Sequence, residues 1–248
     1  MTTTIQETVP SAQQAIDRKT VVQKLLSQLG GGTYLEIGVE LGQSLLPIEA
    51  SQKHGVDPNP IVPVRHRIRM LMQNMFSRNK VHLHQMTSDD FFARRNSILG
   101  DSKIDVALVD GLHTFEQAYN DVLNCLQVLS PRGVIIMHDC NPPSARIALR
   151  ARSHSEALKE FPADGDLRWC GDVWKAIVLL RSFHTDLQTF VLDTDFGLGI
   201  VSRGAATSKL SYSREEIEAM SYEFLAARRT TLLDLRPATS FNEFLASR

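Results

Sequence analysis

The chain has 248 residues, 43% of them hydrophobic, which suits one α/β domain with small additions. Its formal net charge is -1 and no basic run rises above the background, so we expect no nucleic acid partner. There is no signal peptide pattern and no apolar run near the ~20 residues of a membrane span, and the three cysteines lack paired spacing, so we expect no membrane partner and a cytoplasmic protein.

Apolar residues at helical spacing predict a first helix from Ser11 to Leu29, which three glycines end. Five strand-like runs then alternate with helical segments. The strands are expected at 33–39, 55–57, 81–86, 104–109 and 133–137, and the helices at 43–53, 65–76, 88–98, 114–129 and 173–183. This alternation indicates right-handed crossovers and a parallel sheet. The basic residues of 65–69 favour a solvated helix face.

Two last strands, 187–192 and 197–202, are joined by four residues and should therefore pair antiparallel. We predict a Rossmann-like, seven-stranded, mostly parallel sheet with an antiparallel terminal hairpin and helices on both faces. The long insert at 140–171 is expected to be a lid or binding loop.

The chain is expected to divide into an N-terminal helical extension, a cofactor-binding domain and a helical tail. Their predicted bounds are 1–32, 33–203 and 204–248. The tail carries two predicted helices, at 214–229 and 240–246. We expect the extension and the tail to pack on a second subunit, which gives a homo-oligomer, or to roof the substrate site.

The first predicted strand runs into an acidic residue and then into two glycines four positions apart. Gly38 and Gly42 let the chain turn tightly and approach a ligand closely, because no Cβ is in the way. Glu36 stands at the carboxyl end of its strand, where parallel sheets bind ligands. Asp57 ends the second strand, and a carboxylate there can accept hydrogen bonds from both hydroxyls of a ribose.

With Thr87-Ser88-Asp89 after the third strand, Asp110 after the fourth and the terminal hairpin, the chain resembles a class I S-adenosylmethionine-dependent methyltransferase over residues 33–203. The resemblance implies S-adenosylmethionine as the cofactor, with Asp57 on its ribose and Glu36 opposing its ammonium group. The cofactor-binding residues that it implies are Glu36, Gly38, Gly42, Ser44, Asp57, Ser88, Asp89 and Asp110. Glu40 stands where many members have a third glycine.

A second cluster of polar residues follows the adjacent fourth and fifth strands. Asp110 and Asp139 should converge at the carboxyl edge of the sheet, and two carboxylates so close need a cation, a proton or a hydrogen-bond network. This element resembles the metal-dependent O-methyltransferases of natural-product and sugar tailoring, which implies a divalent metal at Asp110, His138 and Asp139. In that group the position of His138 is usually acidic, so the set could favour Mn²⁺ or Fe²⁺ over Mg²⁺ or hold no metal.

His113 is the candidate general base, because an imidazole can take a proton from a substrate hydroxyl near neutral pH. It could instead cap the helix that follows it or orient Asp110, the other candidate catalytic residue. Asn141, Trp169 and Asp172 are candidate substrate contacts, although Asp172 could simply cap a helix.

The predicted function is transfer of the sulfonium methyl group to a hydroxyl of a sugar or secondary metabolite. Methylation of an amine is the second interpretation. A NAD(P)-dependent oxidoreductase is disfavoured, because the full glycine pattern of dinucleotide-binding proteins is missing. A non-catalytic Rossmann-like binding protein is a further alternative, which the charged residues at the strand ends argue against.

Overall fold

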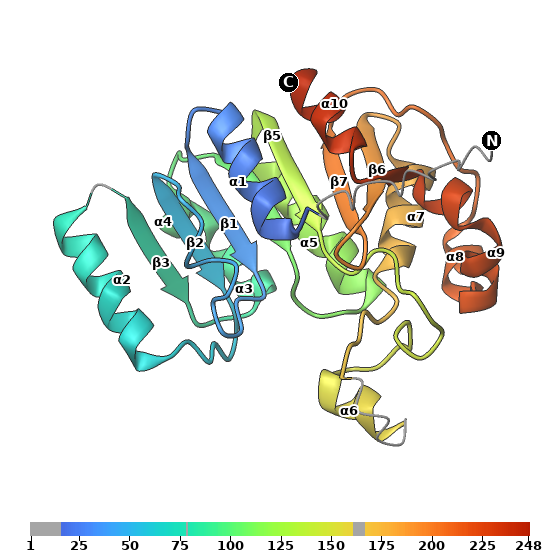
Figure 1. The fold of residues 1–248 in the computed structure, drawn as a ribbon, viewed down its shortest axis with the longest axis horizontal. Helices are drawn as coiled ribbons and strands as arrows, with labels where there is room; N and C mark the ends of the chain where they lie inside the picture. Colours follow the sequence, from blue (N-terminus) through green and yellow to red (C-terminus); the bar gives the residue numbers. More distant parts are fainter. Residues whose placement is uncertain (1–15, 78, 161–166) are drawn as a thin grey trace, which may run out of the picture.

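The computed structural model describes residues 16–77, 79–160 and 167–248. Eight strands form one sheet in the order β3-β2-β1-β4-β5-β7-β6-β8 (Figure 1). The strands are β1 (Thr33–Ile37), β2 (Gln52–Val56), β3 (Lys80–His84), β4 (Ile104–Val109), β5 (Leu129–Met137), β6 (Leu187–Asp193), β7 (Leu198–Arg203) and β8 (Leu235–Pro237). Only β7 runs antiparallel to its neighbours, β5 and β6. The predicted Rossmann-like fold and hairpin are confirmed, and β8 adds an eighth strand.

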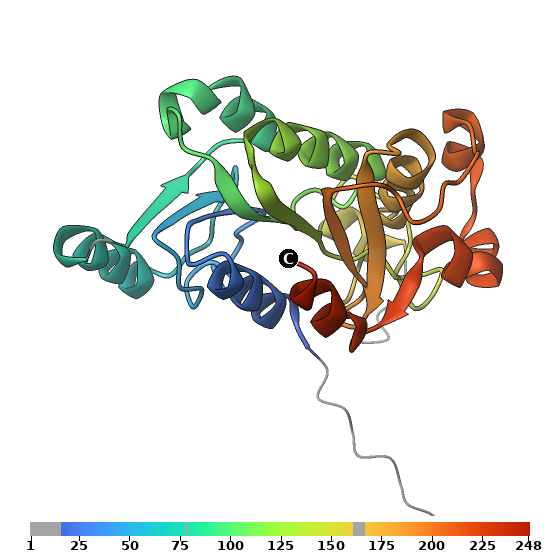
Figure 2. The ribbon, with the colours of Figure 1, turned by 90° about the horizontal axis from the view of Figure 1, so that it is seen from above.

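Helices cover both faces of the sheet (Figure 2). They are α1 (Arg18–Gln28), α2 (Val64–Phe76), α3 (Ser88–Ala93), α4 (Arg95–Leu99), α5 (Phe115–Val128), α6 (His154–Lys159), α7 (Trp174–Phe183), α8 (Arg214–Ala219), α9 (Tyr222–Leu233) and α10 (Ser240–Ala246). One core lies between the sheet and α3, α4, α5 and α7, and a second lies between the sheet and α1 and α10. None of the helices in the described residues is long and apolar enough to cross a membrane.

The connection from β1 to β2 is a series of turns, so the prediction of a helix at 43–53 is wrong. Pro47 lacks the N–H that a helix interior needs. Lys53, on β2 and 2% exposed, points its ammonium group at the carbonyl oxygens of Leu45, Leu46 and Ile48, at 2.9, 3.0 and 2.8 Å. These contacts satisfy the loop carbonyls that a helix would otherwise have paired.

One face of the sheet is covered by α1 and α10, which lie far apart in the sequence. Val21, Val22, Leu25 and Leu26 of α1 pack into the same core as residues of α10, and the two helices lie side by side in Figures 1 and 2. At the other end of the sheet, α8 and α9 pack on α7. The terminal additions therefore complete the domain's own core. The part of the predicted extension before residue 16 lies outside the described residues.

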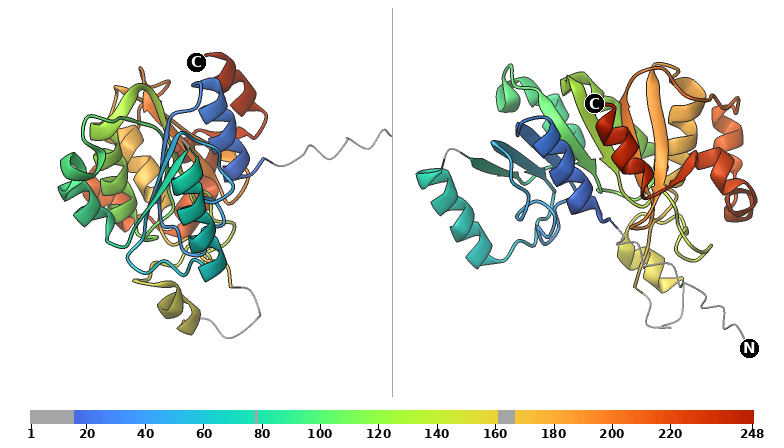
Figure 3. Two further views of the ribbon diagram at one scale, coloured as in Figure 1. Left: turned by 90° about the vertical axis from the view of Figure 1, so that its left-hand side faces the viewer. Right: turned by 45° about the horizontal axis from the view of Figure 1, so that its top comes forward.

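The parallel strands end at one edge of the sheet, which is the lower edge in Figure 1. The segment between β5 and α7 crosses this edge and carries α6, which stands away from the sheet (Figure 3). This segment includes the insert predicted at 140–171, except for residues 161–166, which the structure does not describe. The loops that follow β1, β2, β3, β4 and β5 meet at the same edge, which is where parallel sheets bind ligands.

Candidate active site

A cavity of about 830 Å³ opens at the carboxyl edge of the sheet. It is lined by the loops after β1 to β5, by α1 through Arg18 and by the insert through Trp169. Of the predicted cofactor and metal residues, those that line it are Glu36, Gly38, Ser44, Asp57, Ser88, Asp89, Asp110, His138 and Asp139. Gly42 lies behind the turn, where its N–H donates to the carbonyl of Val39 at 2.7 Å.

The glycine turn has the tight geometry that the sequence predicted. Gly38 has a φ of 88°, and a Cβ there would lie 1.9 Å from the carbonyl oxygen of Asp110, so only glycine fits beside β4. Glu40 also adopts a left-handed conformation, with a φ of 45°. Glu40 thus follows the backbone path of a glycine despite its side chain.

Asp57 holds this turn in place. One oxygen of its carboxylate accepts hydrogen bonds from the N–H groups of Val39 and Glu40, at 3.0 and 2.8 Å, and the other accepts from Asn59 at 2.7 Å. An ionised carboxylate has about four acceptor sites, so Asp57 keeps free acceptor capacity toward the cavity. The backbone bonds to Asp57 also account for the strained conformation of Glu40.

Different polar residues line the two ends of the cavity. At one end Gln117 of α5 donates to Ser88 and Asp89, at 3.2 and 3.3 Å, and thereby ties α5 to α3. At the other end lies Glu36, which is 1% exposed and accepts a 2.6 Å hydrogen bond from the hydroxyl of Tyr34. Burial raises the pKa of Glu36 to about 8. The carboxyl of Glu36 is therefore mostly protonated at neutral pH until a cation approaches it.

Asp110, His113 and Asp139 converge as the sequence predicted. Each offers one ligand atom, and these three atoms lie within 4.8 Å of one another. Two carboxylate oxygens and one imidazole nitrogen are a donor set that suits a divalent transition metal, and the described residues hold no other such group. The predicted metal set had His138 in place of His113.

His113 is held in one orientation. Its Nδ1 lies 3.0 Å from the carbonyl oxygen of Trp169, and since a carbonyl only accepts, Nδ1 carries the proton and Nε2 is left to accept one. The indole of Trp169 stacks on the imidazole at a centroid distance of 4.9 Å. A Cβ on Gly171 would lie 1.9 Å from the carbonyl oxygen of His113, so glycine is needed for this close packing.

The carboxylates change the protonation of His113. Burial alone would lower its pKa, but hydrogen bonding and charge from Asp110 and Asp139 outweigh burial and raise the pKa above the usual 6.5. For Asp110, burial would raise the pKa, but His138, His113 and Arg18 lower it far below its ordinary value. Asp110 is therefore ionised at any physiological pH.

His138 lies between the carboxylates and Arg18. Its Nδ1 is 3.2 Å from one oxygen of Asp110 and 3.2 Å from one oxygen of Asp139, while its Nε2 is 2.6 Å from Nη1 of Arg18. Burial would lower the pKa of His138, but the two carboxylates raise it well above its usual value. A guanidinium only donates, so the contact with Arg18 opposes the protonation of Nε2 that the two carboxylates favour.

Two residues of this cluster, Arg18 and Asp195, were not predicted from the sequence. Arg18 is the first residue of α1, and its Nε lies 3.2 Å from Oγ of Ser44 and 3.7 Å from Asp110. Asp195 lies in the β6–β7 turn with a φ of 46° and accepts the backbone N–H of Arg18 at 2.9 Å. Aspartate is common in turns, so its position alone carried no signal, and Arg18 lies far from every motif.

Two of the three predicted substrate residues lie outside the cavity. Asp172 is 3% exposed, accepts the N–H of Phe115 at the start of α5 at 3.0 Å and pairs with Arg150 at 2.9 Å. This is a helix-capping role, although for α5 rather than for the helix that follows Asp172. Trp169 does line the cavity, and its indole N–H donates to the carbonyl of Leu149 at 2.7 Å.

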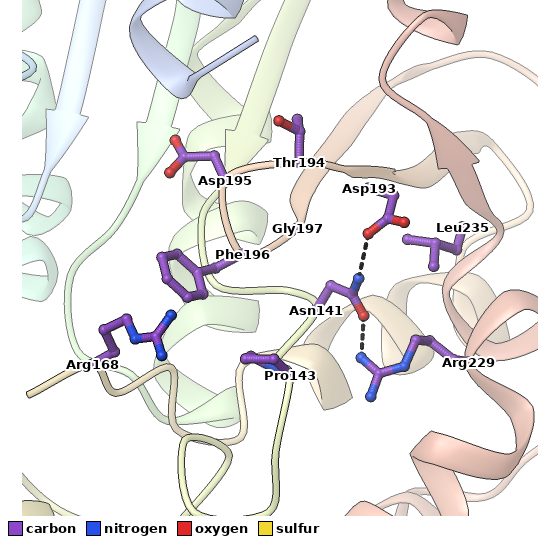
Figure 4. A pocket seen from close by; sticks show the side chains of 10 residues that line it. All are labelled: Asn141, Pro143, Arg168, Asp193, Thr194, Asp195, Phe196, Gly197, Arg229 and Leu235. Carbon is purple, nitrogen blue, oxygen red and sulfur yellow. Dashed lines mark hydrogen bonds between the residues drawn. The ribbon is translucent and has the colours of Figure 1, made fainter. Parts of the chain in front are cut away.

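Asn141 points into a separate cavity of about 520 Å³ beside the β6–β7 turn (Figure 4). Its amide donates to Asp193 at 3.0 Å and accepts a hydrogen bond from Arg229. Its backbone N–H donates to the carbonyl of Phe196 at 2.7 Å. Asn141 thus joins the end of β5 to the turn and to α9.

A sequence model of the family described as "methyltransferase domain" matches residues 35–140 of the chain. Over these residues the chain has the sequence pattern of a methyltransferase domain. The match spans the glycine turn, Asp57, Asp110, His113 and Asp139, and it confirms the predicted class I S-adenosylmethionine-dependent methyltransferase. No curated protein sequence matches the chain.

Solved methyltransferase structures share the fold. The SAH-bound methyltransferase of Podospora anserina is 15% identical, with a TM-score of 0.53 over 79% of this chain and 82% of that one. The O-methyltransferase of Bacillus cereus in complex with SAH is 14% identical, with a TM-score of 0.47 over 77% and 82%. At 15% identity the likeness to the Podospora anserina structure shows the fold alone.

Proposed function

We propose that the chain transfers a methyl group from S-adenosylmethionine to a hydroxyl of a small molecule, with His113 as the general base. The observation that carries this proposal is the state of His113: its Nδ1 is held by the carbonyl of Trp169, which leaves Nε2 as an acceptor beside Asp110 in the cavity. The cofactor supplies an electrophilic methyl group on sulfur, so the protein has to position the acceptor and take its proton.

The cavity residues fit the three parts of this cofactor. Ser88 and Asp89 stand at the end proposed for the adenine, and Asp57 keeps acceptor sites for the ribose hydroxyls. Glu36 lies at the end proposed for the methionine ammonium, whose positive charge would favour its ionised form. The predicted order of contacts along the cofactor thus follows the order of the strands in the sheet.

His113, Asp110 and Asp139 together would remove the proton from the acceptor hydroxyl. Asp139 approaches Nδ1 of His113 at 3.3 Å and Asp110 approaches Nε2 at 3.6 Å, so both would stabilise the imidazolium formed when His113 takes the proton. The stacked indole of Trp169 forms an aromatic wall for the acceptor. A sugar or secondary metabolite hydroxyl is the proposed acceptor, and an amine is the alternative.

The same three side chains are the candidate site for a divalent metal. A metal there would bind the acceptor oxygen and lower its pKa. It would also bind the free ring nitrogen of His113, so His113 cannot be both a metal ligand and the base. Arg18 and His138 already bring positive charge and donors to Asp110 and Asp139, and for this reason we propose the base role for His113.

The experiment is a methylation assay with S-adenosylmethionine carrying a labelled methyl group and a panel of hydroxylated and amino acceptors, before and after dialysis against EDTA. We expect label in a hydroxylated acceptor and unchanged turnover after dialysis. Label found only in amino acceptors would show that the acceptor is an amine and not a hydroxyl. Turnover that is lost on dialysis and restored by Mg²⁺ or Mn²⁺ would mean that a metal, and not His113 as a base, activates the acceptor hydroxyl.

A further inference from the structure

The outer face of α2 is apolar, which inverts the usual pattern of a surface helix. Val64, Ile68, Leu71 and Met75 recur at spacings of four, three and four residues and so form one stripe along the helix. Their side chains are exposed, Val64 to 72% and Met75 to 73%, and Met72 and Phe76 beside them are exposed as well. In Figures 1 and 2, α2 stands at the end of the molecule beyond β3.

The inner side of α2 is held by few contacts. Met70 is its one buried residue, and Asn74 bonds to the backbone of Val81 in β3 through both its amide nitrogen, at 2.7 Å, and its amide oxygen, at 2.8 Å. Arg67 ties the start of the helix to the carbonyls of Val62 and Pro60, at 3.1 and 3.0 Å. The helix is therefore attached to the domain while its apolar stripe faces outward.

Basic residues flank the stripe. At 100° per residue, Arg65 and Arg69 fall on one side of it and Arg67 on the other, and all three are exposed. The sequence has no acidic residue between Asp57 and Asp89. An apolar stripe between arginines, without acidic residues in the adjoining sequence, is the pattern of helices that lie in the interface of a membrane.

We propose that α2 docks the protein on a membrane surface that carries anionic phospholipid headgroups, with the apolar stripe inserted among the acyl chains. The arginines are complementary to the headgroup charge. A second copy of the chain packed through α2 would bring arginines against arginines. One helix from each copy would also bury less than the ~1,200 Å² at the low end of stable interfaces.

The expectation of no membrane partner rested on the absence of a run long enough to span a bilayer, which a helix lying on the surface does not need. The docking proposal is independent of the methyl-transfer proposal. It concerns a helix whose exposed residues do not line the cavity, so lipid binding alone tests it.

The test is flotation of the full chain with vesicles of phosphatidylcholine, with and without phosphatidylglycerol. We expect binding to the anionic vesicles that weakens with added salt. Because each arginine near the surface contributes to binding, R65Q/R69Q should lower it by about tenfold or more, and I68Q/L71Q/M75Q should abolish it. The matched controls are K24Q/R94Q for charge and F183Q for an isolated exposed apolar residue, and both should bind as the wild type does.

Thermal unfolding of each variant shows whether it is folded. If I68Q/L71Q/M75Q is not folded, the single variants M75Q and F76Q should each lose part of the vesicle binding. Absence of binding to anionic vesicles at low salt would overturn the proposal. Equal binding by F183Q and I68Q/L71Q/M75Q would also overturn it. A dimer in light scattering that I68Q/L71Q/M75Q converts to a monomer, without vesicle binding, would assign the face to a second copy of the chain.

Discussion

Nη1 of Arg18 lies 2.6 Å from Nε2 of His138. This contact joins the start of α1 to the residue that follows β5. His138 in turn contacts Asp110 and Asp139 through Nδ1. A residue at the start of the first helix thereby opposes the protonation of a histidine that the two carboxylates favour.

The Arg18→Met substitution should raise the pKa of His138 further. Without the guanidinium, Nε2 is free to take a proton and to donate to Asp195, 3.4 Å away, while Asp110 and Asp139 keep the pKa of His138 well above its usual value. Nitrogen NMR of labelled histidine over a pH titration measures the change. An unchanged or lower pKa of His138 in Arg18→Met would contradict this interpretation, and Arg18→Lys serves as the control that keeps the positive charge.

His113→Gln should lower turnover about 10²- to 10⁴-fold, the usual range for a general base, with little change in cofactor affinity. In the wild type, turnover should rise with pH as His113 loses its proton. The inflection should lie above 6.5, because Asp110 and Asp139 raise the pKa of His113 against the effect of burial. His184→Gln, which removes an imidazole bonded to Tyr119 outside the cavity, is the control. Wild-type turnover in His113→Gln would remove the base assignment.

Binding of S-adenosylmethionine should release a proton from Glu36. Burial raises the pKa of this carboxyl to about 8, so it is protonated at neutral pH, and the cofactor's ammonium favours the ionised form. Affinity should therefore increase from pH 6 toward the folded pKa of about 8 and level off above it. Calorimetry in buffers of different ionisation enthalpy measures the release, and Glu36→Gln should abolish both effects. Binding without proton release in the wild type would contradict the assignment.

Lys53→Met should lower the free energy of unfolding by about 3 kcal/mol, because it leaves several buried carbonyl groups without a donor. These are the carbonyls of Leu45, Leu46 and Ile48, which accept hydrogen bonds from the Lys53 ammonium group. Urea unfolding measures the change, with the exposed Lys24→Met as the matched control. A decrease as small as that of the control would mean that water satisfies these carbonyls as well as Lys53 does.

The strand ends of the site could be predicted from the sequence, because neighbours in a parallel sheet present their carboxyl ends at one edge. Asp57, Asp110, His113 and Asp139 were found in this way. Arg18 could not be, since it lies far from every motif in the sequence and reaches Asp110 and His138 only because α1 packs on the sheet. Asp172 and Asn141 follow predicted elements but point to other partners, and spacing alone does not give a side chain its direction.

A crystal structure of the protein with S-adenosylhomocysteine bound would test the proposed site most directly. We expect the ribose hydroxyls on Asp57, the amino group beside Glu36 and the sulfur facing the side of the cavity where Nε2 of His113 lies. A sulfur that faces away from His113, or a ribose without contact to Asp57, would contradict it.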